Sequence, residues 1–191
     1  MIDKRREILD SYCRRQSFMR RGKRRPDPFI RMIQEKDDNY WMGLAIREAN
    51  KAGARGEVPI GAVVVRDGVV LGRGCNFREK SLDPTSHAEM TAIRKAAKKA
   101  GNWRLLGATL YVTLEPCPMC MGAIILARLE RVVFGCHDPK AGAAGSLYDL
   151  SDDSRLNHRV ELETGVRGEE CAELLSSFFA ALRKKKKQLR K

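Results

Sequence analysis

The stretch 109–120, with the sequence TLYVTLEPCPMC, joins an apolar run to two cysteines. Its β-branched and aromatic residues over 109–114 predict a buried strand, which the following Glu-Pro pair ends. Pro118 suits the first position of a helix, expected to continue over 119–128, because an N–H has no helical partner there. Cys117 then lies at the start of that helix, where the helix dipole and free amide hydrogens favour a thiolate. The stretch therefore predicts a strand followed by a helix that presents two cysteines at its N-terminus.

A second motif, His87-Ala88-Glu89, lies upstream. Residues 83–86 (DPTS) are expected to form a turn with capping residues, and residues 87–100 are rich in Ala, Met, Ile and Lys before Gly101. This pattern predicts a helix from His87 to Ala100 that Gly101 ends. The histidine and Glu89 fall in its first turn, where one side chain can bind a metal while the other faces a substrate.

Together the two motifs offer an imidazole from His87 and thiolates from Cys117 and Cys120. Three protein ligands that leave the fourth tetrahedral position to water are typical of catalytic zinc, whereas structural zinc has four. Zinc lowers the pKa of its water toward about 7. A neighbouring carboxylate can take the proton and pass it to a leaving amine, which is the role expected of Glu89. The sequence therefore predicts a hydrolytic site with one Zn2+ and no organic cofactor.

Other interpretations of these residue types fit the sequence less well. A structural zinc site of four cysteines would need a second close pair, yet the other cysteines stand singly at positions 13, 75, 136 and 171. A redox pair would not need a His-x-Glu motif upstream. Because the three ligand positions are filled, His137 and His158 are expected to be surface or hydrogen-bonding residues, and Glu115 a partner of backbone amides.

The rest of the chain alternates helical and strand patterns. The patterns predict a helix from Asp37/Asp38 to Gly53, strands at 60–66 and 69–75 around an Asp67-Gly68 hairpin turn, strands at 131–136 and 159–163, and a final helix from Glu169 with an apolar face of Leu174, Leu175, Phe178, Phe179 and Leu182. Strands 110–114 and 132–136, joined by one helix, form a right-handed crossover and run parallel. The predicted fold class is a three-layer α/β/α arrangement around a mixed five-stranded sheet.

The charge of the chain is concentrated at its ends. The 191 residues carry a formal net charge of +13, with 12 Lys and Arg against 7 Asp and Glu in residues 1–38, and 7 against none in residues 183–191. We expect a basic N-terminal extension at 1–38, an enzyme domain at 39–182 and a basic C-terminal tail at 183–191. Such tails attract a polyanion such as RNA by counterion release, although basic tails are also often merely solvated.

Several features bear on the compartment. The sequence contains no run of about 18 apolar residues, the length that a membrane-spanning helix needs. Its basic N-terminus lacks the apolar stretch of a secretory signal and has more acidic residues than an organelle transit peptide. Six cysteines, only two of them close together, are typical of a reducing compartment. The sequence predicts a cytoplasmic protein that does not bind membranes.

Residues 39–179 resemble the cytidine deaminase-like superfamily and, within it, the bacterial tRNA-specific adenosine deaminases. Besides the zinc motifs, the resemblance rests on the stretches 58–63 (VPIGAV), 83–89 (DPTSHAE), 109–120, 132–148 (VVFGCHDPKAGAAGSLY) and 157–161 (NHRVE). The zinc motifs alone also suit guanine, cytosine or deoxycytidylate deaminases, but the last two stretches are similar to the tRNA enzymes. The resemblance implies a homodimer that converts the wobble adenosine in the anticodon stem-loop of a tRNA, an arginine tRNA, to inosine.

The resemblance also implies six substrate-binding residues, which are Asn76, Asp138, Asn157, Phe178, Phe179 and Arg183. Asn76 would hydrogen-bond the flipped-out base, Asp138 would approach the nucleotide backbone, and Asn157 would contact the anticodon loop. The two phenylalanines match an aromatic pair on the last helix, although such a pair is more often part of a core. The chain then departs from the family with Ala180-Ala181-Leu182, so that an RNA contact is expected to pass to Arg183 or Lys184.

Two functions of other classes share these features. A small-molecule purine deaminase would use the same zinc chemistry in a closed pocket and would need no basic tails. A non-enzymatic RNA-binding protein on the same fold would lack the general base or a zinc ligand, and this chain has Glu89 and all three ligands.

Overall fold

The computed structural model describes residues 36–189, so the predicted extension over 1–38 lies outside the described residues except for its last three positions. In chain order the elements are α3 (Asp38–Ala54), β1 (Gly61–Arg66), β2 (Val69–Cys75), α4 (Arg78–Ser81), α5 (Ala88–Ala100), β3 (Thr109–Leu114), α6 (Pro118–Leu126), β4 (Arg131–Cys136), β5 (Glu161–Thr164) and α7 (Gly168–Gln188). All of them except the short α4 match a predicted element.

The five strands form one mixed sheet in the order β2-β1-β3-β4-β5. Strand β1 pairs antiparallel with β2 and β3, whereas β3, β4 and β5 run parallel to one another. The predicted parallel crossover through α6 and the predicted five-stranded sheet are therefore confirmed. Strand β5 begins at Glu161 rather than at Arg159, because the amide of Val160 donates to the carbonyl of Ser151 and not to β4.

The hairpin between β1 and β2 turns at the predicted residues. Asp67 has a φ of 51° and Gly68 a φ of 69°. Two consecutive residues with positive φ form the turn whose twist matches that of the flanking strands, and Asp-Gly is a favoured pair for it.

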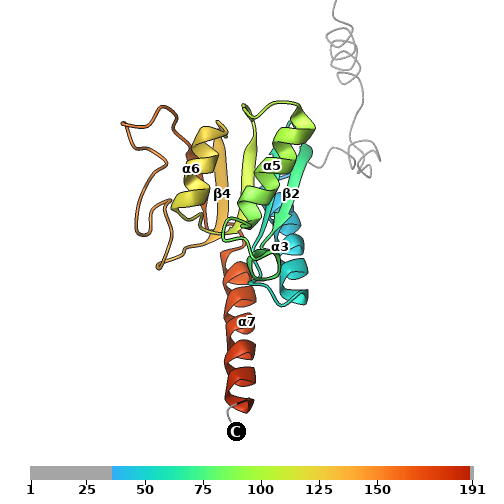
Figure 1. Cartoon of the computed structure of the whole chain (residues 1–191). Coiled ribbons are helices and arrows are strands. Elements are labelled where there is room, and N and C mark those ends of the chain that lie inside the picture. Colours follow the sequence, from blue (N-terminus) through green and yellow to red (C-terminus); the bar gives the residue numbers. More distant parts are fainter. Residues whose placement is uncertain (1–35, 190–191) are drawn as a thin grey trace, which may run out of the picture. The chain divides into compact units, whose positions relative to one another are not determined.

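Alternation along the central strands divides the core between the two faces of the sheet. On one face, Val112 and Phe134 belong to a cluster that includes the buried sides of α5 and α6. On the other face, Tyr111 and Val133 pack with the buried side of α3 and with Cys171 of α7. Figure 1 shows α5 and α6 in front of the sheet and α3 behind it. The predicted three-layer architecture is confirmed.

Glycines in β2 let α5 approach the sheet closely. A Cβ atom added at Gly74 would collide with the carbonyl oxygen of Ala88, and one added at Gly72 would collide with that of Ala92. The carbonyl groups of Ala88 and Ala92 belong to α5 and cannot move without moving the helix. The two glycines therefore set how closely the first turns of α5, which carry His87 and Glu89, approach the sheet.

The final helix covers the sheet only with its first turns. Cys171 is buried and Leu174 packs against the core, whereas Phe179 is 41 % exposed and Leu182 is also exposed. In Figure 1 the remainder of α7 extends past the end of the sheet. Only the first part of the predicted apolar face therefore packs on the sheet, because the strands end before the helix does. The helix continues to Gln188, through the first six residues of the predicted basic tail.

No helix within residues 36–189 has the length and apolar character needed to cross a membrane.

Candidate metal centre and substrate pocket

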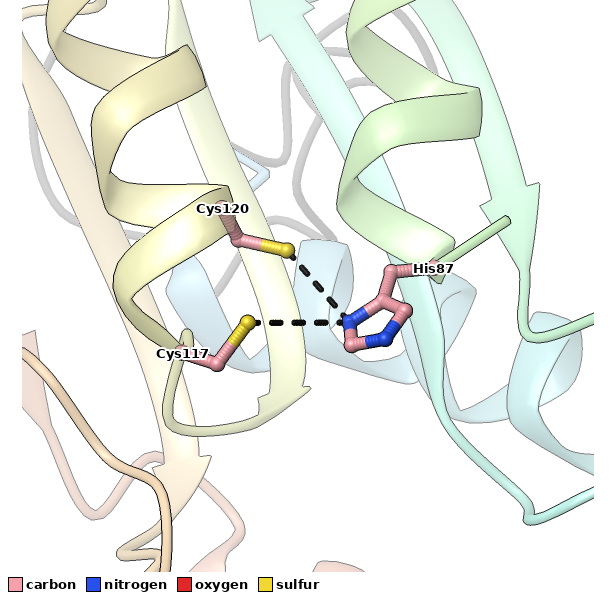
Figure 2. Close-up of side chains that lie close together, drawn as sticks. All are labelled: His87, Cys117 and Cys120. Carbon is pink, nitrogen blue, oxygen red and sulfur yellow. Dashed lines mark hydrogen bonds between the residues drawn. The ribbon is translucent and has the colours of Figure 1, made fainter. Parts of the chain in front are cut away.

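Two helix N-termini bring the predicted metal ligands together. His87 is the N-cap of α5, with φ −76° and ψ 158°, and Cys117 is the N-cap of α6, with φ −75° and ψ 171°. In both caps the backbone is extended and no side-chain hydrogen bond closes the cap, which leaves the imidazole and the thiol free for other partners. Pro118 occupies the first turn of α6, as predicted. Figure 2 shows the three side chains pointing toward one another from these helix starts.

The donor atoms have the spacing of a zinc site. The Nδ1 atom of His87 lies 3.7 Å from the Sγ of Cys117 and 3.6 Å from the Sγ of Cys120, and the three donors all lie within 4.8 Å of one another. Zinc bonds of about 2.3 Å to sulfur and about 2.0 Å to nitrogen at a tetrahedral angle place these atoms roughly 3.5 Å apart. One imidazole and two thiolates also form a donor set that zinc favours. The residues therefore fit Zn2+.

The pKa values of the two thiols are shifted in opposite directions. A hydrogen bond from the Cys120 side chain, helped by another from His87, lowers the pKa of Cys117 to about 4. The same contact with Cys117, together with burial, raises the pKa of the Cys120 thiol. One proton is thus shared between two adjacent sulfurs, and a divalent cation is what would allow both to be thiolates.

Glu89 lies beside these ligands in the first turn of α5. Its side chain is 4 % exposed, and within the described residues its Oε2 atom has no hydrogen-bond partner. Burial raises the pKa of this carboxyl above its ordinary value, while the nearby His87 lowers it. A buried carboxyl with a free oxygen and a raised pKa can hold a proton and release it, as a general acid–base group must.

His87, Cys117 and Glu89 line a pocket of about 410 Å³. Three of the predicted substrate-binding residues, Asn76, Asp138 and Phe179, line the same pocket. Asn76 is buried, and its Nδ2 lies 3.5 Å from Oε2 of Glu57, a buried carboxylate that also accepts from the amides of Glu79 and Lys80. The Oδ1 of Asp138 accepts from the amides of Lys140 and Ala141, which turns the loop after β4.

The other three predicted substrate-binding residues do not line this pocket. Phe178 packs edge-to-face on Phe179, with ring centroids 5.5 Å apart. Arg183 is exposed on the distal part of α7. Asn157 is exposed and accepts from Nη1 of Arg128 with its side-chain oxygen, at 2.7 Å, and with its carbonyl, at 2.9 Å. Contacts of these three residues with RNA stay predictions.

The sequence analysis did not predict helix α4, or the places of Glu57 and Arg78 beside the pocket. Arg78 lines the pocket from the start of α4, and Glu57 accepts from two amides of the same short helix. Neither residue belongs to a motif, and a four-residue helix is too short for a periodic pattern. The only local signal was that residues 76–82 follow a strand and contain no second apolar alternation.

Glu115 is the partner of backbone amides that the sequence predicted. One oxygen accepts from the amides of Ala144 and Ser146, and the other from the amide of Asp138, each at 3.0 Å. The hydroxyl of Ser146 donates to Glu115 as well. Burial would raise the pKa of Glu115, but the hydrogen bonds from Ser146 and the backbone amides outweigh burial and hold the pKa below its ordinary value. The ionised carboxylate therefore anchors the loop 137–146.

The two remaining histidines also form hydrogen bonds, as predicted. The Nδ1 of His137 lies 3.2 Å from Oε2 of Glu115, and the Nε2 of His158 lies 2.7 Å from the carbonyl oxygen of Leu129. Neither histidine belongs to the group of three metal-binding residues.

Comparison with known proteins connects this geometry to a family. Residues 35–136 match the family described as cytidine and deoxycytidylate deaminase zinc-binding region. The chain is 54 % identical over 154 residues to a tRNA-specific adenosine deaminase of Bacillus subtilis strain 168, covering 81 % of this chain and 96 % of the relative.

Solved structures give the same result. A structure from a study of A-to-I editing by tRNA:A34 deaminases at the wobble position is similar with a TM-score of 0.69 and 46 % identity, covering 71 % of this chain and 99 % of that one. A guanine deaminase of Bacillus subtilis is similar with a TM-score of 0.53 and 36 % identity, covering 65 % of this chain and 83 % of that one. By its match to the family and its identity with these relatives, the chain belongs to the cytidine and deoxycytidylate deaminase family and, within it, to the tRNA-specific adenosine deaminases.

Proposed function

We infer that this protein removes the amine of the wobble adenosine of a tRNA anticodon by hydrolysis, which yields inosine and ammonia. The observation that carries this inference is the convergence of His87, Cys117 and Cys120 beside a pocket that the buried carboxyl of Glu89 also lines, in a chain that is 54 % identical to a tRNA-specific adenosine deaminase. We propose an arginine tRNA as the substrate, from the sequence resemblance described above.

The chemistry needs a nucleophile, proton transfer and a bound base. Bound zinc, held by His87, Cys117 and Cys120, would supply Lewis acidity that makes water nucleophilic near neutral pH. Glu89 transfers the two protons of the attacking water in turn, the first to the purine ring nitrogen and the second to the amine, which leaves as ammonia while the oxygen stays on the ring carbon. Burial raises the pKa of Glu89 above its ordinary value, which favours a carboxyl that holds the proton between the two transfers. Its burial prevents the proton from leaking to solvent.

Base binding is assigned to groups on the pocket wall. A base within a stacked loop must be extruded before it reaches a buried site. Asn76 lines the pocket together with Glu89, and its amide offers donors and an acceptor to the edge of a purine. Phe179 supplies an aromatic ring to the same pocket from α7. We propose that Asn76 reads the base and that Asp138 and Phe179 contact the nucleotide.

Replacing Asn76 by Ala should lower kcat/KM on an anticodon stem-loop by about 5- to 150-fold, the equivalent of the 1–3 kcal/mol that an unpaired buried polar edge costs. Zinc content and the thermal midpoint should be nearly unchanged. The control is Asn50→Ala, which removes an exposed asparagine of α3 outside the pocket. Unaltered stem-loop kinetics in Asn76→Ala would show that this residue does not read the base.

We propose that the basic end of α7 binds the RNA backbone. Arg183 and Lys184–Lys187 are exposed on a helix that begins at the sheet and extends past it. Deleting residues 184–191 should weaken binding equally for cognate and scrambled loops. It should also flatten the slope of log affinity against log salt by roughly 0.7–0.9 for each phosphate that the protein no longer neutralises. The rate at saturating RNA should change little, since Glu89 and the ligands lie elsewhere. Superimposable salt titrations of full-length and truncated protein would mean that this end is merely solvated.

We also propose a homodimer in the cytoplasm. The helix α6 is strongly apolar and leaves Leu126 68 % exposed, on the same helix as two of the metal ligands, which supports an interface there. Sedimentation that gave the mass of a monomer would contradict the dimer. Within residues 36–189 no cysteine forms a disulfide, which supports a reducing compartment. Detection of the protein outside the cytoplasm by cell fractionation would contradict the location.

Sequencing of the tRNA pool with and without the gene tests the proposed function in the cell. Inosine at the wobble position of an arginine tRNA should be present only when the gene is intact. Unchanged inosine in a strain that lacks the gene, and has no second deaminase of this family, would contradict the proposal.

A further inference from the structure

His137 lies in the substrate pocket without a part in the proposed chemistry. It follows β4 directly and lines the pocket together with Asn76, Glu89 and the metal ligand His87. Its side chain is 57 % exposed, and its ring lies nearly perpendicular to that of Phe134, with the centroids 5.0 Å apart. The ring is therefore held on one side by the core and is open to the pocket on the other.

Glu115 determines which nitrogen of this ring carries the hydrogen. Oε2 of Glu115 lies 3.2 Å from Nδ1 of His137, and the Glu115 side chain is fully buried. Both oxygens of this carboxyl are already acceptors, Oε2 from the amide of Asp138 and the hydroxyl of Ser146, and Oε1 from the amides of Ala144 and Ser146. Nδ1 must then carry the hydrogen. In the neutral ring, Nε2 is left with a lone pair and is a hydrogen-bond acceptor.

The neighbouring serine does not use that lone pair. The hydroxyl oxygen of Ser146 lies 3.4 Å from Nδ1 of His137, on the same nitrogen that faces Glu115. In a nucleophilic triad the hydroxyl and the carboxylate bind opposite nitrogens of the imidazole. Ser146, His137 and Glu115 therefore do not form a nucleophilic triad, and their contacts only fix the orientation of the imidazole ring. Nε2 of His137 stays available to a ligand in the pocket.

The burial of the lining residues indicates which part of a nucleotide His137 would meet. Glu89 is 4 % exposed at the base of the pocket, whereas His137 is largely exposed at its rim. A flipped nucleotide enters with its base first, so its ribose and phosphates remain at the rim. Phosphate oxygens cannot donate a hydrogen bond, and the amine of the base is the reacting group beside Glu89. The remaining donor of an internal RNA nucleotide is its 2′-hydroxyl.

We propose that His137 binds the 2′-hydroxyl of the nucleotide in the pocket, which donates to Nε2, and that Glu115 is the positioning residue that fixes the ring. The proposal rests on the proposed function, since it requires an RNA substrate. Arg78, Asp138 and Lys140 line the same pocket, and the two cations can bind the phosphates next to the ribose. His137 would thus favour binding of a target nucleotide with ribose over one with deoxyribose.

Two substitutions of His137 test the roles of its two ring nitrogens separately. His137→Asn keeps a donor at the position of Nδ1, and so the contact with Glu115, but removes the outer acceptor. His137→Gln places an amide oxygen near the position of Nε2. Each variant and the wild type are assayed for inosine formation on an anticodon stem-loop with either adenosine or 2′-deoxyadenosine at the target.

On the ribose substrate, His137→Asn should raise KM about three- to ten-fold, the loss of one hydrogen bond, with a much smaller change in kcat. His137→Gln should recover most of the wild-type KM. On the 2′-deoxy substrate, His137→Asn and the wild type should have the same KM. A wild-type KM for His137→Asn on the ribose substrate would overturn the proposal, and so would a loss that persists on the 2′-deoxy substrate, which would indicate a phosphate contact. A wild-type enzyme that forms no inosine in the stem-loop would overturn the proposed function and this proposal together.

Discussion

Replacing Glu89 by Ala is expected to lower kcat on an anticodon stem-loop by about 10²- to 10⁴-fold, the usual contribution of a general acid–base group. The zinc content should stay at one per chain, because Glu89 is not among the ligands His87, Cys117 and Cys120. The stability of the fold should not decrease either. Burial raises the pKa of Glu89, and one of its oxygens has no hydrogen-bond partner within the described residues, so its removal takes away an unfavourable group.

Glu89→Gln is the matched variant for this experiment. It keeps the size and polarity of the side chain but cannot carry the proton, so it should be as inactive as Glu89→Ala. Metal analysis and the thermal midpoint are measured on the same samples, so that a loss of activity is not confused with a loss of metal or of fold. Comparable turnover by zinc-replete Glu89→Ala or Glu89→Gln protein would mean that another group transfers the proton.

His87→Ala and Cys120→Ala are expected to lose both zinc and activity. Their donor atoms lie 3.6 Å apart across the centre, and two remaining ligands hold zinc much more weakly than three. Zinc at 100 times its Kd stabilises a protein by about 2.7 kcal/mol, which corresponds to roughly 5–10 °C in the midpoint of a domain of this size. The wild type should therefore show a midpoint that rises with zinc, and the two variants should show no such rise.

The control for the metal experiment is Cys75→Ala, which removes a free thiol at the end of β2, outside the group of metal-binding residues. This variant should bind zinc and gain the same midpoint increase as the wild type. A stoichiometric zinc content in Cys120→Ala after dialysis against a chelator would contradict the proposed ligand set.

Local signals predicted the two halves of the metal centre. Pro118 fixes the start of α6, and Gly101 ends α5 with a φ of 64°, so both helices could be placed from the sequence. The role of Glu115 followed from its place at the turn between β3 and α6. These positions depend on residues that lie next to one another in the chain, and sequence patterns describe such neighbours well.

Contacts between distant residues could not be predicted in this way. Asn157 accepts a hydrogen bond from Arg128, which lies 29 positions away in the chain and has a φ of 59°. No sequence pattern in either segment predicts this contact. The hydrogen bond between Asn76 and Glu57 depends on how α4 closes over the end of β2. The exposed half of α7 has an apolar pattern of the kind that usually covers a sheet, but the strands end before it. Such features are set by the lengths of packed elements and not by local composition.

The most direct test of the central claim offers zinc-loaded protein three substrates side by side, which are an anticodon stem-loop with adenosine at the wobble position, free adenosine and free guanine. Ammonia release is measured for all three, and inosine is located in the stem-loop by nuclease digestion and mass spectrometry. The zinc centre, the pocket and the family predict inosine at the wobble position alone, with little ammonia from the free compounds. Rapid release of ammonia from guanine with an unmodified stem-loop would contradict the account and would indicate a guanine deaminase, the activity of one of the similar structures.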